Sequence, residues 1–269
     1  MRQETAEFLN FLAEAFERKL KWATLRGYVP ALSRYLRYVD ILQVKRLLKG
    51  VFNLRPPVAR YTAMWDVNIV LNYMEAMVTT SFKDKSMKLA TLLMILSGNR
   101  VNMLTHFTLP NMFITDKECT FVFDEVLKST RPSFNINPMT FKAFSDRPAL
   151  CPVQLIWDYL ECRNQLSGDT QFFVTLKSPF NGAQPGTIAR WVKEMLCLSG
   201  VQDGRYTAHS CRSASTSSAL FRGISLSTIV RSASWKGVKT FKKHYLREIK
   251  GVYDLNKENF GEETLLRNT

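Results

Sequence analysis

The chain has few of the residues that build disulfide frameworks or metal centres. Among 269 residues there are five cysteines and three histidines, and no two cysteines form a CxxC pair. An odd number of cysteines without paired spacing argues against a disulfide scaffold and against a zinc ribbon. We therefore expect free thiols in a reducing compartment. Clusters of acidic residues with metal-ligand spacing are missing too, so the sequence predicts no metal and no other cofactor.

Long apolar runs are also missing. No stretch approaches the ~18 consecutive apolar residues of a membrane span. The charged N-terminal segment lacks the apolar core of a signal peptide. The apolar fraction of 46% is nevertheless normal for a folded chain. We expect a soluble, globular protein with no membrane partner.

Negative charge is scarce. Lysine and arginine number 37 against 23 acidic residues, which gives a net charge of +14. Such an excess favours an anionic partner, and nucleic acid is the usual one because neutralising phosphates releases counterions. A membrane surface, or charge that merely keeps the protein soluble, is the alternative interpretation.

The first part of the chain has a helical pattern. Apolar residues recur at helical spacing over 8–20, over 24–38 and over 41–52. Pro30 lies inside the second pattern, where it either kinks the helix or marks a first turn. The segment Arg55-Pro56-Pro57 then breaks helical structure and predicts a linker. We therefore expect a helical domain over 1–57 and a larger domain over 58–269.

The larger domain is predicted to combine helices with one small sheet. Residues 119–126 alternate apolar and polar side chains, as a strand does, and 133–137 is the expected hairpin partner. The predicted helices span 66–78, 84–97, 152–166, 187–198, 208–221, 226–233 and 240–249. The expected fold class is mainly α with a small antiparallel β-sheet.

Two basic side chains stand at the start of one predicted helix. His209 and Arg212 are three residues apart, which places them on one helical face. Thr207 is a suitable N-cap, and a helix N-terminus favours bound anions. Taken alone, such a pair is more often an ordinary surface pair. Its meaning therefore depends on residues elsewhere in the chain.

Three segments together resemble the tyrosine recombinase family. LMILSGNRVNMLTHFTL is similar to the first arginine box of the family, YTAHSCRSASTSSALFRGISLSTIVRSASW to its second box, and FKKHYLREI to its nucleophile box. The sequence is most similar to recombinases of eukaryotic mobile elements, namely DIRS and Ngaro retrotransposons and Crypton transposons. The resemblance implies six catalytic residues in the order of the family: Arg100, Lys128, His209, Arg212, Trp235 and Tyr245.

The sequence departs from the family at two places. The usual count from the His/Trp position reaches His244, one residue before Tyr245. Because the covalent link of this family is made through tyrosine, a one-residue insertion after Trp235 reconciles the pattern, and Tyr253 stays as an alternative. The N-terminal part is also short beside the core-binding domain of the family, which is compatible with a natural protein that extends upstream of Met1.

The resemblance implies metal-independent cutting and rejoining of DNA. Arg100 and Arg212 would offer bidentate donors to the phosphate oxygens. Tyr245 would attack the phosphorus and form a 3′-phosphotyrosine, with His209 handling its proton. Lys128, in the predicted hairpin turn, would protonate the leaving 5′ hydroxyl.

Each residue alone has a plainer interpretation. Arg100 could be an ion-pair partner at a helix end, and Lys128 a solvated lysine in a turn. Trp235 could anchor the core, although it could also support the phosphate pocket by packing. Tyr245 could complete an apolar stripe with Phe241. We favour the catalytic interpretation because all six elements occur together and in order.

The resemblance also implies partners. We expect a two-domain clamp on double-stranded DNA, with a helical core-binding domain and a mixed α+β catalytic domain, that assembles in the nucleus as a homotetramer, a dimer of dimers, on two DNA sites. The tail from about 251 would pass to a neighbouring subunit or dock on its own domain. The rival interpretations are a non-catalytic DNA-binding protein descended from a recombinase and a type IB topoisomerase. The candidate DNA contacts are the basic residues Arg26, Arg34, Lys45, Arg46, Lys236, Lys242 and Lys243.

Overall fold

The computed structural model describes residues 3–32, 34–36, 38–58, 61–125, 130, 137–201, 204–235 and 237–250. The chain forms two compact units, Met1–Arg60 and Tyr61–Thr269. The sequence predicted this boundary three residues earlier, after residue 57. The mainly helical composition with a small antiparallel sheet is confirmed. Among the described residues, none of the helices is long and apolar enough to cross a lipid bilayer.

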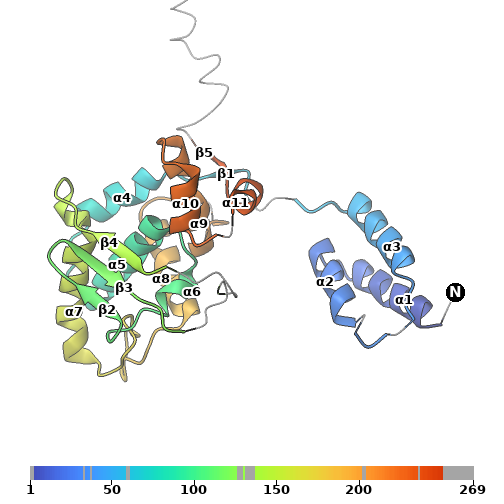
Figure 1. Ribbon diagram of the computed structural model, residues 1–269, viewed down its shortest axis with the longest axis horizontal. Helices are drawn as coiled ribbons and strands as arrows, with labels where there is room; N and C mark the ends of the chain where they lie inside the picture. The colour runs from blue at the N-terminus through green and yellow to red at the C-terminus, as the bar shows by residue number, and fades with distance from the viewer. Residues whose placement is uncertain are drawn as a thin grey trace, which may run out of the picture. The chain divides into compact units, whose positions relative to one another are not determined.

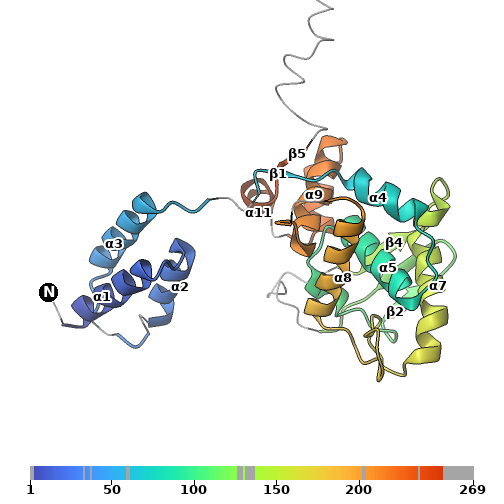
Figure 2. The same ribbon diagram turned by 180° about the vertical axis from the view of Figure 1, so that it is seen from behind.

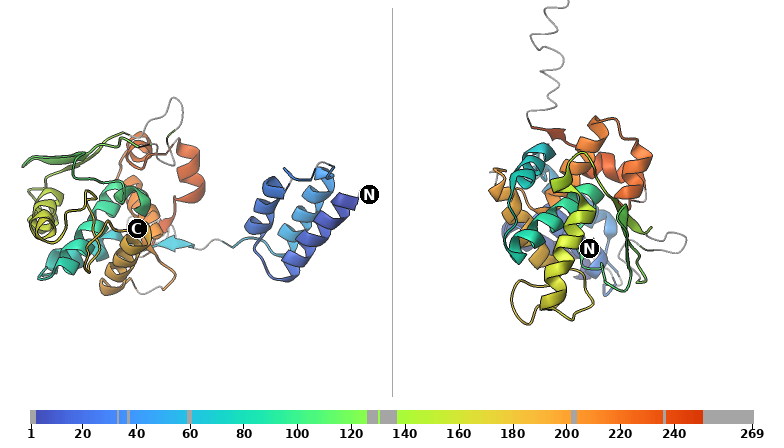
Figure 3. Two further views of the ribbon diagram at one scale, coloured as in Figure 1. Left: turned by 90° about the horizontal axis from the view of Figure 1, so that it is seen from below. Right: turned by 90° about the vertical axis from the view of Figure 1, so that its left-hand side faces the viewer.

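The N-terminal unit is a bundle of helices that lie side by side (Figure 3). These are α1 (Gln3–Glu17), α2 (Trp22–Leu32) and α3 (Ile41–Leu54). Their apolar faces enclose a small core that includes Phe8, Leu12, Leu25, Val44 and Leu48. Asp40 caps α3 by accepting hydrogen bonds from the backbone N–H groups of residues 42 and 43.

Two sequence expectations change in this unit. The helix predicted to reach residue 38 ends at Leu32, and Pro30 lies in its last turn. The N–H groups of Tyr35 and Leu36 bond to the carbonyl of Leu32, so the chain turns there instead of continuing the helix. Arg55, which the sequence predicts to lie in the linker, donates hydrogen bonds to carbonyls at the end of α1 and beyond it.

The C-terminal unit is built around one buried helix. Helix α5 (Phe82–Ser97) buries 11 of its 16 residues, so it is covered on nearly all sides. A capping box of Ser81 and Asp84 begins it, and Gly98 ends it in the left-handed conformation. The elements of this unit are β1 (Ala63–Met64), α4 (Val67–Ala76), α5 (Phe82–Ser97), α6 (Val101–Leu104), β2 (Met112–Ile114), β3 (Glu118–Phe121), β4 (Met139–Lys142), the 3-10 helix at Pro148–Leu150, α7 (Pro152–Leu166), α8 (Pro185–Leu198), α9 (Ala208–Phe221), α10 (Leu226–Ser232), α11 (Val238–His244) and β5 (Glu248–Ile249).

Helix α5 lies between the sheet and α8. The sheet is on the near side in Figure 1, and α8 is on the near side in the opposite view of Figure 2. Helices α7, α8 and α9 all pack against α5. Six of the helices predicted in this unit, from 66–78 to 226–233, are confirmed to within two residues at each end. Helices with a strong apolar period are predictable because the period itself specifies the buried face.

The antiparallel sheet has the strand order β2-β3-β4. The strand predicted at 119–126 is shorter, since β3 ends at Phe121. Its predicted partner at 133–137 lies outside the described residues except for Asn137, which is not in a strand. The strand that pairs is β4, from Met139, and the sequence did not predict β2. Packing of Phe107 on Phe121, with ring centroids 3.9 Å apart, joins the sheet to the core.

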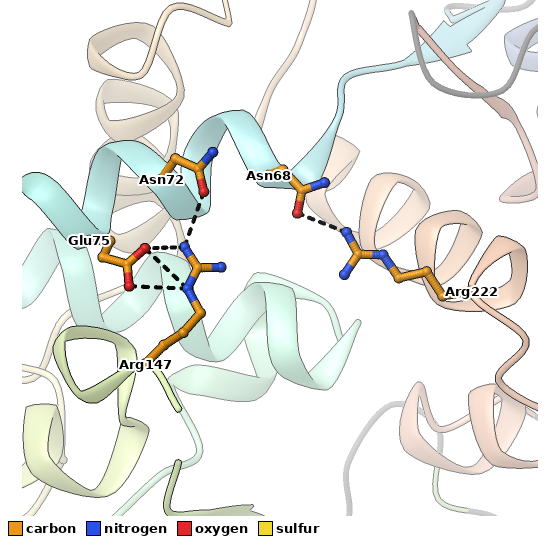
Figure 4. Close-up of polar contacts among 5 residues, drawn as sticks. All are labelled: Asn68, Asn72, Glu75, Arg147 and Arg222. Carbon is orange, nitrogen blue, oxygen red and sulfur yellow. Dashed lines mark hydrogen bonds and ion pairs between the residues drawn. The ribbon is translucent and has the colours of Figure 1, made fainter. Parts of the chain in front are cut away.

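Helix α4 is held by two arginines that come from different loops (Figure 4). Arg147 forms an ion pair with Glu75 and donates to Asn72 at 3.1 Å. Its hydrogen bond holds the pKa of Glu75 below the usual value. Arg222, directly after α9, donates to the side chain of Asn68 at 2.8 Å. The contact of Arg222 ties α4 to the end of α9, and the contacts of Arg147 tie α4 to the start of the 3-10 helix.

The helix predicted over 240–249 is wrong in its second half. Helix α11 ends at His244, and β5 pairs in parallel with β1, far earlier in the chain. The N–H groups of Tyr245 and Leu246 both bond to the carbonyl of Phe241. The N–H of Arg247 instead donates to the hydroxyl of Ser217 on α9, which draws the chain off the helix. Tyr245 therefore lies at the end of a helix and not inside one.

Candidate active site

Arg212 is the centre of the candidate site. Its side chain, on the first turns of α9, is only 1% exposed. One terminal nitrogen donates to the carbonyl of Ala233 at 2.7 Å, whereas Nε has no hydrogen-bond partner among the described residues. Burial lowers the pKa of Arg212 to about 10; Tyr245 opposes this shift, and the charge of Arg100 adds to it. The guanidinium is therefore still charged at neutral pH, and it lies within electrostatic reach of both residues.

Aromatic rings surround the guanidinium. The Cζ of Arg212 is 4.3 Å from the ring centroid of Trp235 and 5.1 Å from that of Tyr245. The rings of Trp235 and Tyr245 are 4.7 Å apart, and the ring of His209 is 5.9 Å from that of Tyr245. The indole N–H of Trp235 is buried and has no partner in the described part of the chain. The arrangement thus presents unused donors beside a phenol.

Arg100 comes to the site from the end of α5. It is exposed and occupies the N-cap position of α6. The preceding residue, Asn99, is buried and donates to the carbonyl of Ser232 at 2.8 Å. Gly98 has a φ of +60°, and a Cβ there would lie 2.8 Å from the methyl group of Thr216 on α9. These contacts seat the turn before Arg100 against α9 and α10.

Tyr245 is held by its backbone as well as by its ring. Its carbonyl accepts a hydrogen bond from the Ser217 hydroxyl at 3.1 Å, and its side chain is 8% exposed. The neighbouring His244, which the usual family spacing would select, is exposed. The packing therefore directs the ring of Tyr245, and not that of His244, toward Arg212. Tyr253 lies outside the described residues.

The structure brings only some of the predicted site residues together. Five of them, spread over residues 100 to 245, lie close together: Arg100, His209, Arg212, Trp235 and Tyr245. Lys128 and Lys236 lie outside the described residues. The other candidate DNA contacts are exposed on their own units: Arg26, Arg34, Lys45 and Arg46 in the N-terminal unit, and Lys242 and Lys243 on α11.

Sequence reasoning missed the residues that hold the site in place. Asn99 and Ser217 anchor Arg100 and Tyr245 through hydrogen bonds to distant backbone groups. Nothing local marks either residue, because asparagine is common in turns and Ser217 lies in a run of small residues. Thr207 is the N-cap of α9, as predicted, but its side chain makes no capping hydrogen bond. Within the described ranges, no group of three His, Cys, Asp or Glu side chains could hold a metal ion.

Comparison with known proteins shows which solved structures share this fold. No family model and no curated protein matches the sequence. Among solved structures, the XerH site-specific recombinase in a post-cleavage complex with palindromic difH substrate aligns with a TM-score of 0.64 at 11% identity, over 98% of this chain and 71% of that one. The Tn1549 transposon integrase aligns with a TM-score of 0.56 at 10% identity, over 97% and 85% of the two chains.

A third structure agrees. XerA recombinase aligns with a TM-score of 0.53 at 16% identity, over 100% of this chain and 93% of that one. The chain has the fold of these recombinases. At such low identity the comparisons show the fold alone, and the similarity to recombinases of eukaryotic mobile elements stays a prediction.

Proposed function

We propose that the chain is a DNA strand transferase that breaks and rejoins DNA through a covalent 3′-phosphotyrosine at Tyr245. The observation that carries this proposal is the buried, charged and incompletely paired guanidinium of Arg212 beside the ring of Tyr245. A charged group with an unused donor is costly to bury unless a ligand satisfies it. A phosphodiester supplies both the negative charge and the acceptor oxygens.

The proposed phosphate site uses fixed donors. Arg212 and Arg100 are two guanidiniums within electrostatic reach of each other, so they repel unless an anion lies between them. The indole N–H of Trp235 is a further unused donor beside Arg212. Donors that are already in place stabilise the charge that develops on phosphate oxygens in the transition state. The chemistry then requires no metal ion.

The proposed reaction begins at the Tyr245 hydroxyl. Its oxygen attacks the phosphorus, its proton passes to His209, and the bond from phosphorus to the 5′ oxygen breaks. The leaving 5′ oxygen takes a proton, for which we propose Lys128 as the acid on the basis of the family resemblance. Rejoining is the reverse reaction with a 5′ hydroxyl as nucleophile. The bond energy is kept in the phosphotyrosine, so no nucleotide cofactor is needed.

The remaining proposals concern assembly and setting. The helical N-terminal unit, with exposed Arg26, Arg34, Lys45 and Arg46, would contact DNA phosphates opposite the catalytic unit, as in a clamp. We further propose a homotetramer on two DNA sites, with exchange of the tail from about 251 between subunits. Integration or excision of a mobile element in a nucleus is the setting that the sequence resemblance favours.

A suicide substrate tests the chemistry. DNA selected for binding from a random library would be nicked near the cleavage point and incubated with the full chain in EDTA. We expect an SDS-resistant protein–DNA band with the wild type and none with Tyr245→Phe. His244→Ala and Tyr253→Phe are the matched controls, and both should keep the band.

The outcomes separate the rival functions. No band from any variant, despite tight binding, would support a non-catalytic DNA-binding protein. A band that persists in Tyr245→Phe but disappears in Tyr253→Phe would move the nucleophile to the tail. Relaxation of supercoiled DNA without four-way junctions between paired sites would favour a topoisomerase.

A further inference from the structure

A second reactive pair of side chains lies away from the candidate active site. The ammonium of Lys85, near the start of α5, donates a hydrogen bond to the Sγ of Cys162 on α7 at 3.0 Å. It also donates to the carbonyl of Asp158 at 3.2 Å. Both residues are partly exposed, so the pair lies at the edge of the core and is not fully enclosed by it. Lys85 precedes Ser97 by twelve residues, about 18 Å along the helix axis, which separates the pair from the phosphate site.

The other cysteines provide a contrast within the same chain. Burial raises the pKa of the Cys119 and Cys211 thiols to about 12, which keeps them protonated. Cys151 is buried and accepts a hydrogen bond from the N–H of Phe144. Cys197 is more exposed than Cys162, but no ammonium bonds to it among the described residues. Since the thiolate is the reactive form, exposure together with an ammonium partner marks Cys162 as the reactive thiol.

We propose that Cys162 and Lys85 form an oxidant-sensitive pair, in which a hydroperoxide oxidises the sulfur and the lysine amine then closes a covalent S–N link between α7 and α5. In the first step the Cys162 thiolate attacks one peroxide oxygen. The S–O bond forms, the O–O bond breaks, and the second oxygen leaves after protonation, as water from hydrogen peroxide or as an alcohol from an organic hydroperoxide. The sulfur becomes a sulfenic acid.

In the second step the neutral amine of Lys85 attacks that sulfur. The N–S bond forms, the S–O bond breaks, and hydroxide leaves as water with a proton from the amine. The hydrogen bond to Cys162 is the main cause that raises the pKa of Lys85. Oxidation changes the sulfur that accepts this hydrogen bond, so one cause that favours the charged amine is weakened, although Asp158 and Glu161 still favour the ammonium. Because α5 packs on α7, the two atoms are already in place.

Mass spectrometry of the full chain treated with hydrogen peroxide tests the proposal. With a trapping reagent such as dimedone present, we expect an adduct at Cys162 about ten times faster than at Cys197. Without the reagent, we expect a peptide pair joined through residues 85 and 162, lighter than the sum of its parts by about 2 Da because two hydrogens are lost.

Two substitutions of the lysine separate its two roles. Lys85→Arg keeps a positive charge but removes the nucleophilic amine, so the adduct should persist while the link disappears. Lys85→Met removes both, so the rate at Cys162 should fall to that at Cys197 or below. Faster oxidation of Cys197 in the wild type, or an unchanged rate at Cys162 in Lys85→Met, would overturn the proposal. Neither readout involves cleavage or binding of DNA, so the result is independent of the function proposed above.

Discussion

Two buried arginines in the C-terminal unit differ in how completely their guanidinium groups are hydrogen-bonded. Arg163 on α7 is 2% exposed, and its guanidinium donates to the carbonyls of Ser167, Asp169, Gln171 and Phe172. It thereby organises the loop that follows the helix. Arg212 on α9 is equally buried, but it uses one carbonyl and leaves Nε unpaired.

The difference lies in what surrounds each charge. Carbonyl oxygens converge on Arg163 from one loop, so its burial is compensated within the fold. Arg212 instead meets the faces of two aromatic rings and the charge of a second arginine. Such a group adds little to folding stability, and its Nε has no acceptor among the described residues. A saturated buried arginine thus indicates a structural role, and an unsaturated one marks a candidate binding site.

The largest expected effect is on stability at Arg163. Arg163→Met leaves several loop carbonyls without a donor, and removal of one partner from a buried polar network costs about 3–5 kcal/mol. For a unit of this size the melting temperature should fall by roughly 6–20 °C. Differential scanning calorimetry measures this change. Covalent cleavage per folded molecule, measured well below the melting temperature, should stay unchanged, because Arg163 touches none of the candidate site residues.

The converse is expected at Arg212. Arg212→Met should lower the rate of covalent cleavage by about 10²–10³, the usual loss for one preorganised donor to a transition state. Its melting temperature should stay close to that of the wild type, because an apolar side chain replaces an incompletely paired charge. Single-turnover cleavage and calorimetry on the same sample check both parts. Collapse of the fold in this variant would contradict the comparison.

A smaller effect is expected at Asn99. Asn99→Ala removes the hydrogen bond to the Ser232 carbonyl that seats the turn before Arg100. We expect a roughly tenfold loss of cleavage rate, since small displacements of a catalytic group are costly, with binding of DNA nearly unchanged. Equilibrium binding and single-turnover cleavage separate these two quantities. Equal losses in both would show that Asn99 supports the fold in general and not the position of Arg100.

The smallest effect concerns pH. The folded-state pKa of Arg212 is lowered from its ordinary value to about 10, so between these two values the unfolded chain binds more protons than the folded chain. Stability should therefore rise with pH in this range, by at most about 1.4 kcal/mol per unit. The unfolding free energy of the wild type minus that of Arg212→Met, from urea titrations between about pH 9 and 11, isolates this term. A difference that falls with pH would show that burial does not lower this pKa.

The sequence alone determined most of the helices and the mainly α fold class, and it named the residues of the candidate site. The boundaries of α7 and α9 were predictable because an apolar period specifies which face is buried, whatever that face meets. The order of the arginine, histidine, tryptophan and tyrosine positions pointed to one chemistry before any geometry was known.

Only the tertiary structure decided how those residues work together. The end of α11 at His244 depends on Ser217 of α9 and on the pairing of β5 with β1, contacts that span up to 185 positions of the chain. No local pattern distinguishes Arg163 from Arg212, because each is an arginine on an amphipathic helix. Whether a buried charge is saturated depends on the acceptors that distant segments bring to it, and those are specified only once the chain is folded.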